Sequence, residues 1–326
     1  MDPLARSAQY AKLVEERLGK VLSDVEPASL GEAVRHYPLA GGKRFRPALA
    51  MAACEAVGGT ADAALPLACA VEMVHNFSLV HDDIMDRDPV RRGLPAVHVK
   101  FGEPAAILAG DTLFAVAFEE IARLRCPPAV RVDILADFAR ATRVLCEGQQ
   151  MDMEFAGREV GREEYLEMIY RKTAALYETA ARNGALCGGG SHAAVEALSA
   201  YGRAFGMAFQ VRDDLLGVVS TEKKTGKPKE SDIRNGKRTL ILLTALQNAD
   251  DEQRALLEST VGNANATPAR VARVHEIFLE TGAVDDAVKL TERYHQEAVE
   301  ALEPLPANPA REFLVRLAEH AGRREA

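Results

Sequence analysis

Four aspartates are crowded into the segment HDDIMDRD, residues 81–88, where an otherwise apolar helical pattern ends. Asp82 and Asp86 are four residues apart, so a helix places both carboxylates on one face. Like charges at this spacing destabilise a helix, and acids at its C-terminal end oppose the helix dipole. A solvated helix end paired with arginines is the alternative interpretation. Such a cluster favours Mg²⁺, which typically takes one or two carboxylates together with waters and substrate phosphates.

A second pair of carboxylates has the same placement. The segment QVRDD, residues 210–214, lies near the end of another long apolar pattern. Taken alone, Asp213 and Asp214 are equally consistent with an exposed helix end. Two facing sites of this kind would form a multi-metal clamp for a diphosphate.

Several groups of cations are separate from these acids. GGKRFRP at residues 41–47 and the Arg91–Arg92 pair crowd arginine and lysine together, Lys172 is followed by Thr173, and lysines are frequent over residues 220–238. Each alone fits a solvated surface charge. In combination with the acids they predict a site for more phosphate than a metal can neutralise, because arginine grips phosphate oxygens as a fork and lysine as a point charge.

Composition narrows the class of protein. The chain has 326 residues, 48% of them apolar, with 40 Lys and Arg against 48 Asp and Glu, a net charge of -8. The apolar share excludes a largely disordered chain, and the charge argues against a broadly basic nucleic-acid binder. Five cysteines without CxxC spacing indicate buried or semi-buried thiols in a reducing compartment. No run reaches the roughly 18 to 20 apolar residues of a membrane span, so we expect a cytoplasmic protein.

The elements that must position these residues are helices. Apolar residues recur three and four apart, good helix formers fill the windows, and alternating β-branched runs are missing. We expect a single-domain, all-α protein, residues 1–326, of about a dozen helices, with residues 220–236 as a polar loop. The expected helices are 4–22, 61–85, 104–124, 130–155, 163–186, 192–219, 239–247, 251–261, 268–281, 283–302 and 309–320.

The ordered motifs GGKRFRP, HDDIMD with RRG, KT, FQVRDD, GK and GKRT resemble the trans-type polyprenyl diphosphate synthases, which include farnesyl and geranylgeranyl diphosphate synthases. The resemblance covers about residues 41–240. It implies a helical fold around a deep central cavity, usually a homodimer, that joins isopentenyl diphosphate to an allylic diphosphate with Mg²⁺, two or three ions. Ionisation of the allylic diphosphate would be driven by electrostatic stabilisation of the leaving group.

The same resemblance assigns roles residue by residue. Asp82 and Asp86 ligate Mg²⁺ with Asp83 in support, and Asp213 holds a further ion, with Asp214 as an additional candidate. Residues around the diphosphate of isopentenyl diphosphate are Lys43, Arg46, His75 and Arg92. Residues around the allylic diphosphate are Arg91, Lys172, Thr173, Gln210, Lys227 and Lys237; of these, Thr173 and Gln210 could steady the allylic cation.

The chain departs from the family pattern at one position. The second motif is commonly DDxxD, whereas here Gly217 stands in place of the third carboxylate. Gly217 is therefore outside the expected metal site, and weakened activity is a possible consequence.

Product length depends on the helix that carries the first motif, because one turn advances about 5.4 Å, close to one isoprene unit. The growing product is expected to run along this helix, and a bulky residue one or two turns before Asp82 would act as a floor that stops its growth. The candidates for this floor are Phe77, Ser78 and Val74. The positions of these residues around the helix do not by themselves place Phe77 on the side of Asp82, where the product would lie. Ordinary packing in the core is the alternative role for Phe77. An aromatic five residues before the motif and a small residue four before it resemble archaeal-type C20 synthases. This predicts geranylgeranyl diphosphate, with farnesyl diphosphate as the alternative product.

Three other functions remain open. A terpene cyclase shares the acidic motif but leaves Lys43, Arg46 and Arg92 without a purpose. A non-catalytic partner subunit of a synthase is suggested only by Gly217, and the intact first motif argues against it. A helical scaffold without chemistry is the third.

Overall fold

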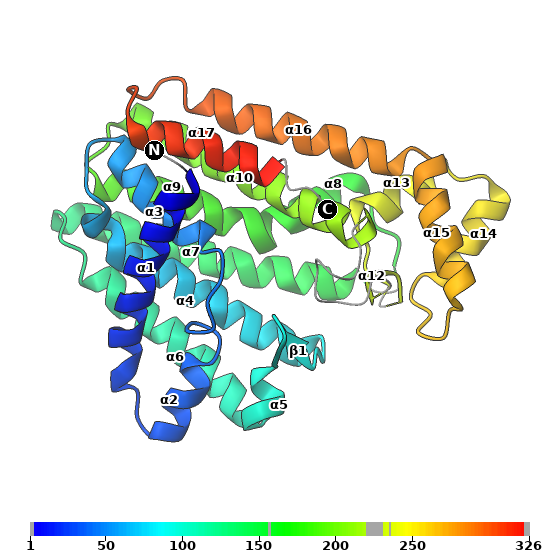
Figure 1. The fold of residues 1–326 in the computed structure, drawn as a ribbon, viewed down its shortest axis with the longest axis horizontal. Helices are drawn as coiled ribbons and strands as arrows, with labels where there is room; N and C mark the ends of the chain where they lie inside the picture. The colour runs from blue at the N-terminus through cyan, green and yellow to red at the C-terminus, as the bar shows by residue number, and fades with distance from the viewer. Residues whose placement is uncertain (1–2, 156–157, 220–230, 235, 323–326) are drawn as a thin grey trace. The chain divides into compact units, whose positions relative to one another are not determined.

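The computed structural model describes residues 3–155, 158–219, 231–234 and 236–322 (Figure 1). Helices make up most of this part of the chain, so the all-α prediction is confirmed. The chain divides into two compact units. Unit 1 comprises Met1–Arg143, Leu176–Gly202 and Val299–Leu317, and unit 2 comprises Val144–Ala175, Arg203–Ala298 and Ala318–Ala326. Helices α7 (Pro128–Glu154) and α10 (His192–Val219) contribute residues to both units.

Unit 1 is built around α4 (Ala61–Met85), which packs against α3 (Phe45–Ala56) and α6 (Glu103–Ala122). Ala, Leu, Cys and Val on all sides of α4 are buried, and this is typical of a central helix. The other elements of unit 1 are α1 (Pro3–Val21), the short 3₁₀ turn η1 (Leu22–Asp24), α2 (Ala28–Arg35), α5 (Val97–Phe101), α9 (Ala175–Cys187, from Leu176 onward), the first part of α7, the first part of α10, and α17 (Pro309–Gly322) up to Leu317.

The start of α4 is set by a side chain. The Thr60 hydroxyl accepts a hydrogen bond from the Ala63 N–H, which satisfies one of the unpaired donors of the first turn. Among the described residues α4 alone is long and apolar enough to cross a membrane. Of its most apolar stretch, 67% is buried within the protein, as in a core helix.

A two-stranded hairpin interrupts the helices directly after the first acidic segment. Strand β1 (Val90–Arg91) pairs antiparallel with β2 (Leu94–Pro95), with Arg91 opposite Leu94. The turn residues Arg92 and Gly93 have φ values of 53° and 75°. Positive φ at both central residues is the geometry of the tight turns that suit the twist of a hairpin. This small turn holds Arg91 and Arg92 close after the aspartates.

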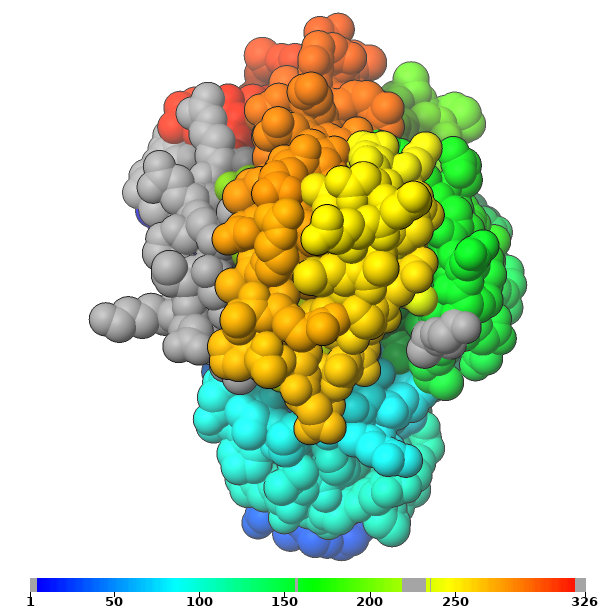
Figure 2. Space-filling model, turned by 90° about the vertical axis from the view of Figure 1, so that its right-hand side faces the viewer, coloured from blue at the N-terminus to red at the C-terminus, as the bar shows by residue number. Residues whose placement is uncertain are grey.

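Unit 2 has its own apolar core, to which α8 (Arg162–Ile169), the middle of α10, α13 (Leu240–Asn248) and α15 (Pro268–Glu280) contribute buried side chains. Helices α14 (Asp251–Thr260) and α15 lie side by side, yellow and orange in Figure 2. The remaining elements are α12 (Ser231–Arg234), the end of α7 and α16 (Ala283–Ala301) up to Ala298.

Several sequence expectations differ from the structure. Helices α2 and α5 were not predicted, and α12 lies within residues 220–236, which were expected to form a loop. Residues 220–230 and 235 of that expected loop lie outside the described residues. Helix α3 was not predicted, because its residues are apolar on every side and give no amphipathic period. The single helix expected over residues 163–186 is divided by a π-helical turn, η2 (Tyr170–Ala174), into α8 and α9. All five cysteines are free thiols, but Cys146 is exposed rather than buried.

Candidate active site

The first acidic cluster lies at the C-terminal end of α4, and its aspartates have different surroundings. Asp82 is half-buried and Asp86 is exposed, whereas Asp83 is fully buried. The Asp83 carboxylate accepts a hydrogen bond from the Tyr37 hydroxyl at 2.5 Å and one from Arg91 Nε at 2.6 Å. Burial, together with the bond to Asp83, raises the pKa of Tyr37, so the hydroxyl stays protonated and donates. Asp83 is thus buried and held by Tyr37 and Arg91, while solvent reaches Asp82 in part and Asp86 more fully.

The cations of residues 41–47 differ in their surroundings, since one is buried with a structural role and another is exposed. Arg44 is buried, adopts a left-handed conformation (φ 49°), and bonds Glu72 at 2.5 Å and the Pro38 carbonyl. Its guanidinium therefore holds the loop against α4. Lys43 is exposed, and the Arg46 guanidinium lies 4.2 Å from the centre of the Tyr177 ring, a cation–π distance.

His75 on α4 lies among these cations. Burial, followed by the positive charges of Arg46 and Arg92, lowers the pKa of His75 well below its usual value. Arg92 Nη1 donates to the Gly41 carbonyl at 3.2 Å, and a Cβ on Gly42 would lie 3.2 Å from the same nitrogen. Unit 1 thus brings the hairpin arginine to the glycine loop that precedes Lys43, and it surrounds a neutral imidazole with positive charge.

In unit 2 the second acidic pair divides in the same way as the first. Asp213 is exposed and Asp214 is 3% exposed. The Asp214 carboxylate accepts hydrogen bonds from the Tyr165 hydroxyl, from Gln210 Nε2 at 3.1 Å and from Lys237 Nζ at 3.1 Å. Two of the residues that the resemblance names, Gln210 and Lys237, are therefore joined by one buried carboxylate.

The π-helical turn η2 carries Lys172 and Thr173. Lys172 Nζ lies 2.5 Å from Asp152 Oδ2 on α7, and the Thr173 hydroxyl donates to Gln210 Oε1 at 2.9 Å. A Cβ on Gly148 would lie 2.3 Å from the Lys172 nitrogen, so α7 approaches this turn only because residue 148 is glycine. Asp152 was not among the predicted residues, and its position on a continuous helix gives no sequence signal. Lys227, also predicted, lies outside the described residues.

The chain-length candidates differ in their surroundings. Val74 is fully buried and Ser78 is 8% exposed, with its hydroxyl donating to the His75 carbonyl at 2.9 Å. Phe77 is half-buried and contacts the rings of His81 and Phe114, at centroid distances of 4.9 and 5.6 Å.

The acidic side chains fit a hard divalent cation of the Mg²⁺ type. Among the described residues no three His, Cys, Asp or Glu side chains cluster closely enough to form a complete metal site. Mg²⁺ does not need one, because it keeps waters and binds through one or two carboxylates and substrate phosphates. Asp82 and Asp86, one turn apart at the end of α4, have the donor type and the exposure that this mode of binding requires.

Comparison with known proteins agrees with this chemistry. The family model described as "Polyprenyl synthetase" matches residues 27–278. The chain is 45% identical to a short chain isoprenyl diphosphate synthase of Methanothermobacter thermautotrophicus over 97% of both chains. It is 41% identical to a geranylgeranyl diphosphate synthase of Methanosarcina mazei, over 96% of this chain and 95% of that one. The crystal structure of geranylgeranyl pyrophosphate synthetase from Pyrococcus horikoshii Ot3 superposes with a TM-score of 0.95 at 42% identity, covering 99% of both chains.

The structure of a more distant relative contains a metal ion. A geranylgeranyl pyrophosphate synthase from Corynebacterium glutamicum, 28% identical over 97% of this chain and 99% of that one, with a TM-score of 0.89, was crystallised with isoprenyl diphosphate and magnesium. Proteins of this family bind a divalent metal, and the family implies isopentenyl and allylic diphosphates as substrates. The chain belongs to the polyprenyl synthetase family and is a short-chain prenyltransferase of the geranylgeranyl diphosphate synthase type.

Proposed function

We propose that this prenyltransferase makes geranylgeranyl diphosphate, C20, by 1'-4 condensation of isopentenyl diphosphate with an allylic diphosphate. The observation that carries the chain length is the Phe77 ring, five residues before Asp82 and braced by Phe114, beside the small and buried Ser78. The names of the relatives from Methanosarcina and Pyrococcus support the same product. Farnesyl diphosphate is the alternative product, and a non-catalytic partner subunit is the alternative function.

Two or three Mg²⁺ ions would be held by Asp82 and Asp86 of unit 1 and by Asp213 of unit 2, since these carboxylates are exposed or half-buried. When bound, the metal supplies a Lewis acid and a template for the diphosphate oxygens. Asp83 and Asp214 are buried and already accept several hydrogen bonds, so we assign them a supporting role.

We assign the cations and their neighbours to two groups, one for the diphosphate of each substrate. We assign Lys43, Arg46, His75 and Arg92 to the diphosphate of isopentenyl diphosphate, and Arg91, Lys172, Thr173, Gln210, Lys227 and Lys237 to the allylic diphosphate. Within unit 1, Arg46 and Arg92 both act on the charge of His75, so these three side chains are near neighbours. Within unit 2, Gln210 connects Thr173 to Asp214.

The reaction follows from this charge. The allylic C–O bond breaks and its electron pair leaves with the diphosphate, whose growing negative charge Arg91, Lys172 and Lys237 stabilise. The Thr173 hydroxyl and the Gln210 amide present oxygen atoms that can steady the allylic cation. The double bond of isopentenyl diphosphate then supplies the electron pair of the new C–C bond. A proton leaves the adjacent carbon, and the released diphosphate accepts it.

The proposal also covers the assembly. Leu108 and Phe114 on α6 and Val132 and Leu135 on α7 expose between 37% and 64% of their surface. Large apolar side chains left exposed on two helices are suited to burial against a partner, and this supports a homodimer. We propose one synthase domain, residues 1–326, to which both units contribute motifs. Because the membrane-length helix α4 is buried in unit 1, we also propose a cytoplasmic location.

The test is a product assay. Purified protein is incubated with isopentenyl diphosphate and dimethylallyl, geranyl or farnesyl diphosphate, with and without Mg²⁺, and products are separated by chromatography. A Mg²⁺-dependent C20 product is expected. A C15 product, or products beyond C20, would keep the reaction and reject the floor. Turnover without isopentenyl diphosphate would indicate a cyclase, and no condensation with any primer would favour the partner subunit.

A further inference from the structure

The two acidic pairs share a pattern of burial and hydrogen bonding that the sequence motifs alone do not reveal. In each pair the first aspartate is accessible to solvent, in part for Asp82 and more fully for Asp213, and the second is buried: Asp83 is 0% exposed and Asp214 is 3% exposed. Burying a carboxylate costs several kcal/mol unless hydrogen bonds and a counter-charge replace the lost water. Each buried aspartate has both, and in each the neutral donor is a buried tyrosine.

In unit 1 the tyrosine is Tyr37, from the turn after α2. Its hydroxyl bonds Asp83 Oδ2, and Arg91 Nε and Nη2 lie 2.6 and 2.5 Å from Asp83 Oδ1. Tyr37 and Arg91 thus use different oxygens of the same carboxylate. A guanidinium has five N–H donors in a fixed fork, and two of its nitrogens face Asp83. The remaining edge has donors for another anion.

In unit 2 the corresponding residues are Tyr165 and Lys237. The Tyr165 hydroxyl bonds Asp214 Oδ2, and Lys237 Nζ lies 3.1 Å from Oδ1. The ammonium has three donors, and Asp214 accepts one of them. The tyrosine again takes one carboxylate oxygen and the cation takes the other.

We infer that Tyr37 and Tyr165 are positioning residues, which hold Asp83 and Asp214 so that these carboxylates fix Arg91 and Lys237 for the allylic diphosphate. The inference rests on the proposed function, in which both cations meet that diphosphate. Each hydroxyl restricts the rotation of its aspartate, and the aspartate in turn restricts the long side chain of Arg91 or Lys237. The entropy cost of ordering that side chain is then met in the free protein and does not weaken the binding of the diphosphate. The first aspartate of each pair is the one that the proposed function assigns to the metal.

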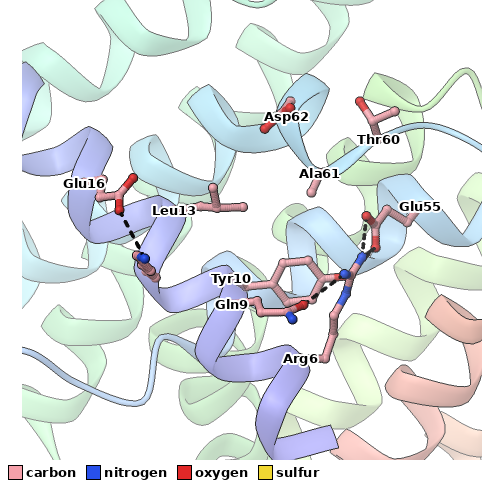
Figure 3. A pocket seen from close by; sticks show the side chains of 10 residues that line it. Arg6, Gln9, Tyr10, Leu13, Glu16, Glu55, Thr60, Ala61 and Asp62 are labelled. Carbon is pink, nitrogen blue, oxygen red and sulfur yellow. Dashed lines mark hydrogen bonds and ion pairs between the residues drawn. The ribbon is translucent and has the colours of Figure 1, made fainter. Parts of the chain in front are cut away.

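The molecule contains a matched control for this arrangement. In unit 1 the Tyr10 hydroxyl bonds Glu55 Oε2 at 2.5 Å, and Arg6 Nη2 bonds Glu55 Oε1 at 2.6 Å (Figure 3). The three groups are a tyrosine, a carboxylate and an arginine, as around Asp83, but they come from α1 and α3 and no acidic motif is part of them. Tyr10→Phe therefore removes the same kind of bond without touching the proposed machinery.

The experiment compares Tyr37→Phe, Tyr165→Phe and Tyr10→Phe with the full wild-type protein. For each we would measure the KM of both substrates, kcat, the midpoint of thermal unfolding, and the calorimetric Kd of geranyl thiodiphosphate. This probe is an allylic diphosphate whose bridging oxygen is sulfur, so it binds without ionising readily. We expect the allylic KM and the probe Kd to rise about three- to tenfold in Tyr37→Phe and Tyr165→Phe, which is the scale of one hydrogen bond. The KM of isopentenyl diphosphate should change less than about twofold.

Tyr10→Phe should lower the unfolding midpoint and leave both constants unchanged. If the two site variants behave like Tyr10→Phe, the tyrosines only stabilise the fold and the inference is overturned. If a site variant does not fold, Arg91→Lys and Lys237→Arg replace it, since they keep the charge and change its reach; an unchanged probe Kd in both would equally reject the inference.

Failure of the proposed function gives a different pattern. No condensation by the wild-type protein, combined with probe binding that weakens in Tyr37→Phe and Tyr165→Phe, would reject the synthase reaction and keep the positioning role. No probe binding by the wild-type protein would reject both, because the cations would then have no diphosphate to meet.

Discussion

The Phe77 ring on α4 lies 5.6 Å, centroid to centroid, from the Phe114 ring on α6. The row continues within unit 1, because Phe114 lies 4.9 Å from Phe118 and Phe118 lies 5.4 Å from Phe138. The first pair is tilted and the other two are edge-on; edge-on aromatic pairs contribute about 0.5–1.5 kcal/mol each beyond their buried area. Phe77 is therefore held in place by neighbours on other helices, which the proposed floor for the product chain requires.

Phe77→Ala should lengthen the product beyond C20, because it removes the ring while Ser78 and Val74 remain. It should also lower the stability of the fold, by about 2 kcal/mol or more. Chromatography of the products from farnesyl diphosphate measures the first effect and thermal unfolding the second. Phe101→Ala is the control, since Phe101 on α5 packs against His36 instead of this row. An unchanged product distribution in Phe77→Ala would assign the ring to core packing alone.

Removing either outward-facing aspartate should abolish most turnover. We expect Asp82→Ala and Asp213→Ala each to lower kcat/KM by about 10² to 10³ or more, the scale of losing one charge-stabilising group. Neither should lower the unfolding midpoint much, because Asp82 is only partly buried and Asp213 is exposed. Asp133→Ala, an exposed aspartate on α7, should retain wild-type activity. Retained condensation in Asp82→Ala would contradict the metal assignment.

The helices were predictable where an apolar face repeats, as in α15 or α16. The π-helical turn was not, because it depends on packing: Lys172 reaches its position only where α7 has a glycine, Gly148, 24 residues earlier. Helix α3 was missed for the opposite reason, since a helix buried on all sides has no polar face to reveal its period.

For the candidate site, the sequence indicates residue types and not the partners of each residue. Spacing draws attention to the aspartates, but it does not distinguish Asp82 from Asp83. The difference arises because the hydroxyl of Tyr37, 46 residues away, donates a hydrogen bond to Asp83. Likewise nothing in the run of cations distinguishes Arg44, buried against Glu72, from the exposed Lys43. These differences arise from tertiary partners, which a local pattern does not contain.

Gly217 offers a direct test of the missing third carboxylate. It is four residues after Asp213 on α10, so an aspartate there would lie on the same helix face as Asp213. Gly217→Asp should lower the Mg²⁺ concentration that gives half-maximal rate, by about threefold to tenfold, the scale of one further hydrogen-bonded charge. Gly217→Asn matches its size without the charge and should leave the Mg²⁺ requirement near the wild-type value. Equal shifts in both variants would assign the effect to helix propensity.

His75 makes the stability of the fold depend on pH. Burial and the nearby arginines lower its pKa in the folded protein, whereas the unfolded chain titrates near 6.5. Below about pH 6.5 the unfolded state therefore binds a proton that the folded state does not, and the free energy of unfolding falls as the pH falls. One such group contributes a slope of at most about 1.4 kcal/mol per pH unit.

His75→Gln should therefore flatten the loss of stability between pH 7.5 and 5.5. The measurement is denaturant unfolding at several pH values for the wild-type protein, His75→Gln and His192→Gln. His192 is an exposed residue at the start of α10, so its replacement should preserve the wild-type slope. Other groups that titrate in this range contribute equally to all three proteins, and the difference between slopes isolates His75. If His75→Gln and the wild-type protein lose stability in parallel, the imidazole is already protonated in the folded state, and Arg46 and Arg92 do not exclude its charge.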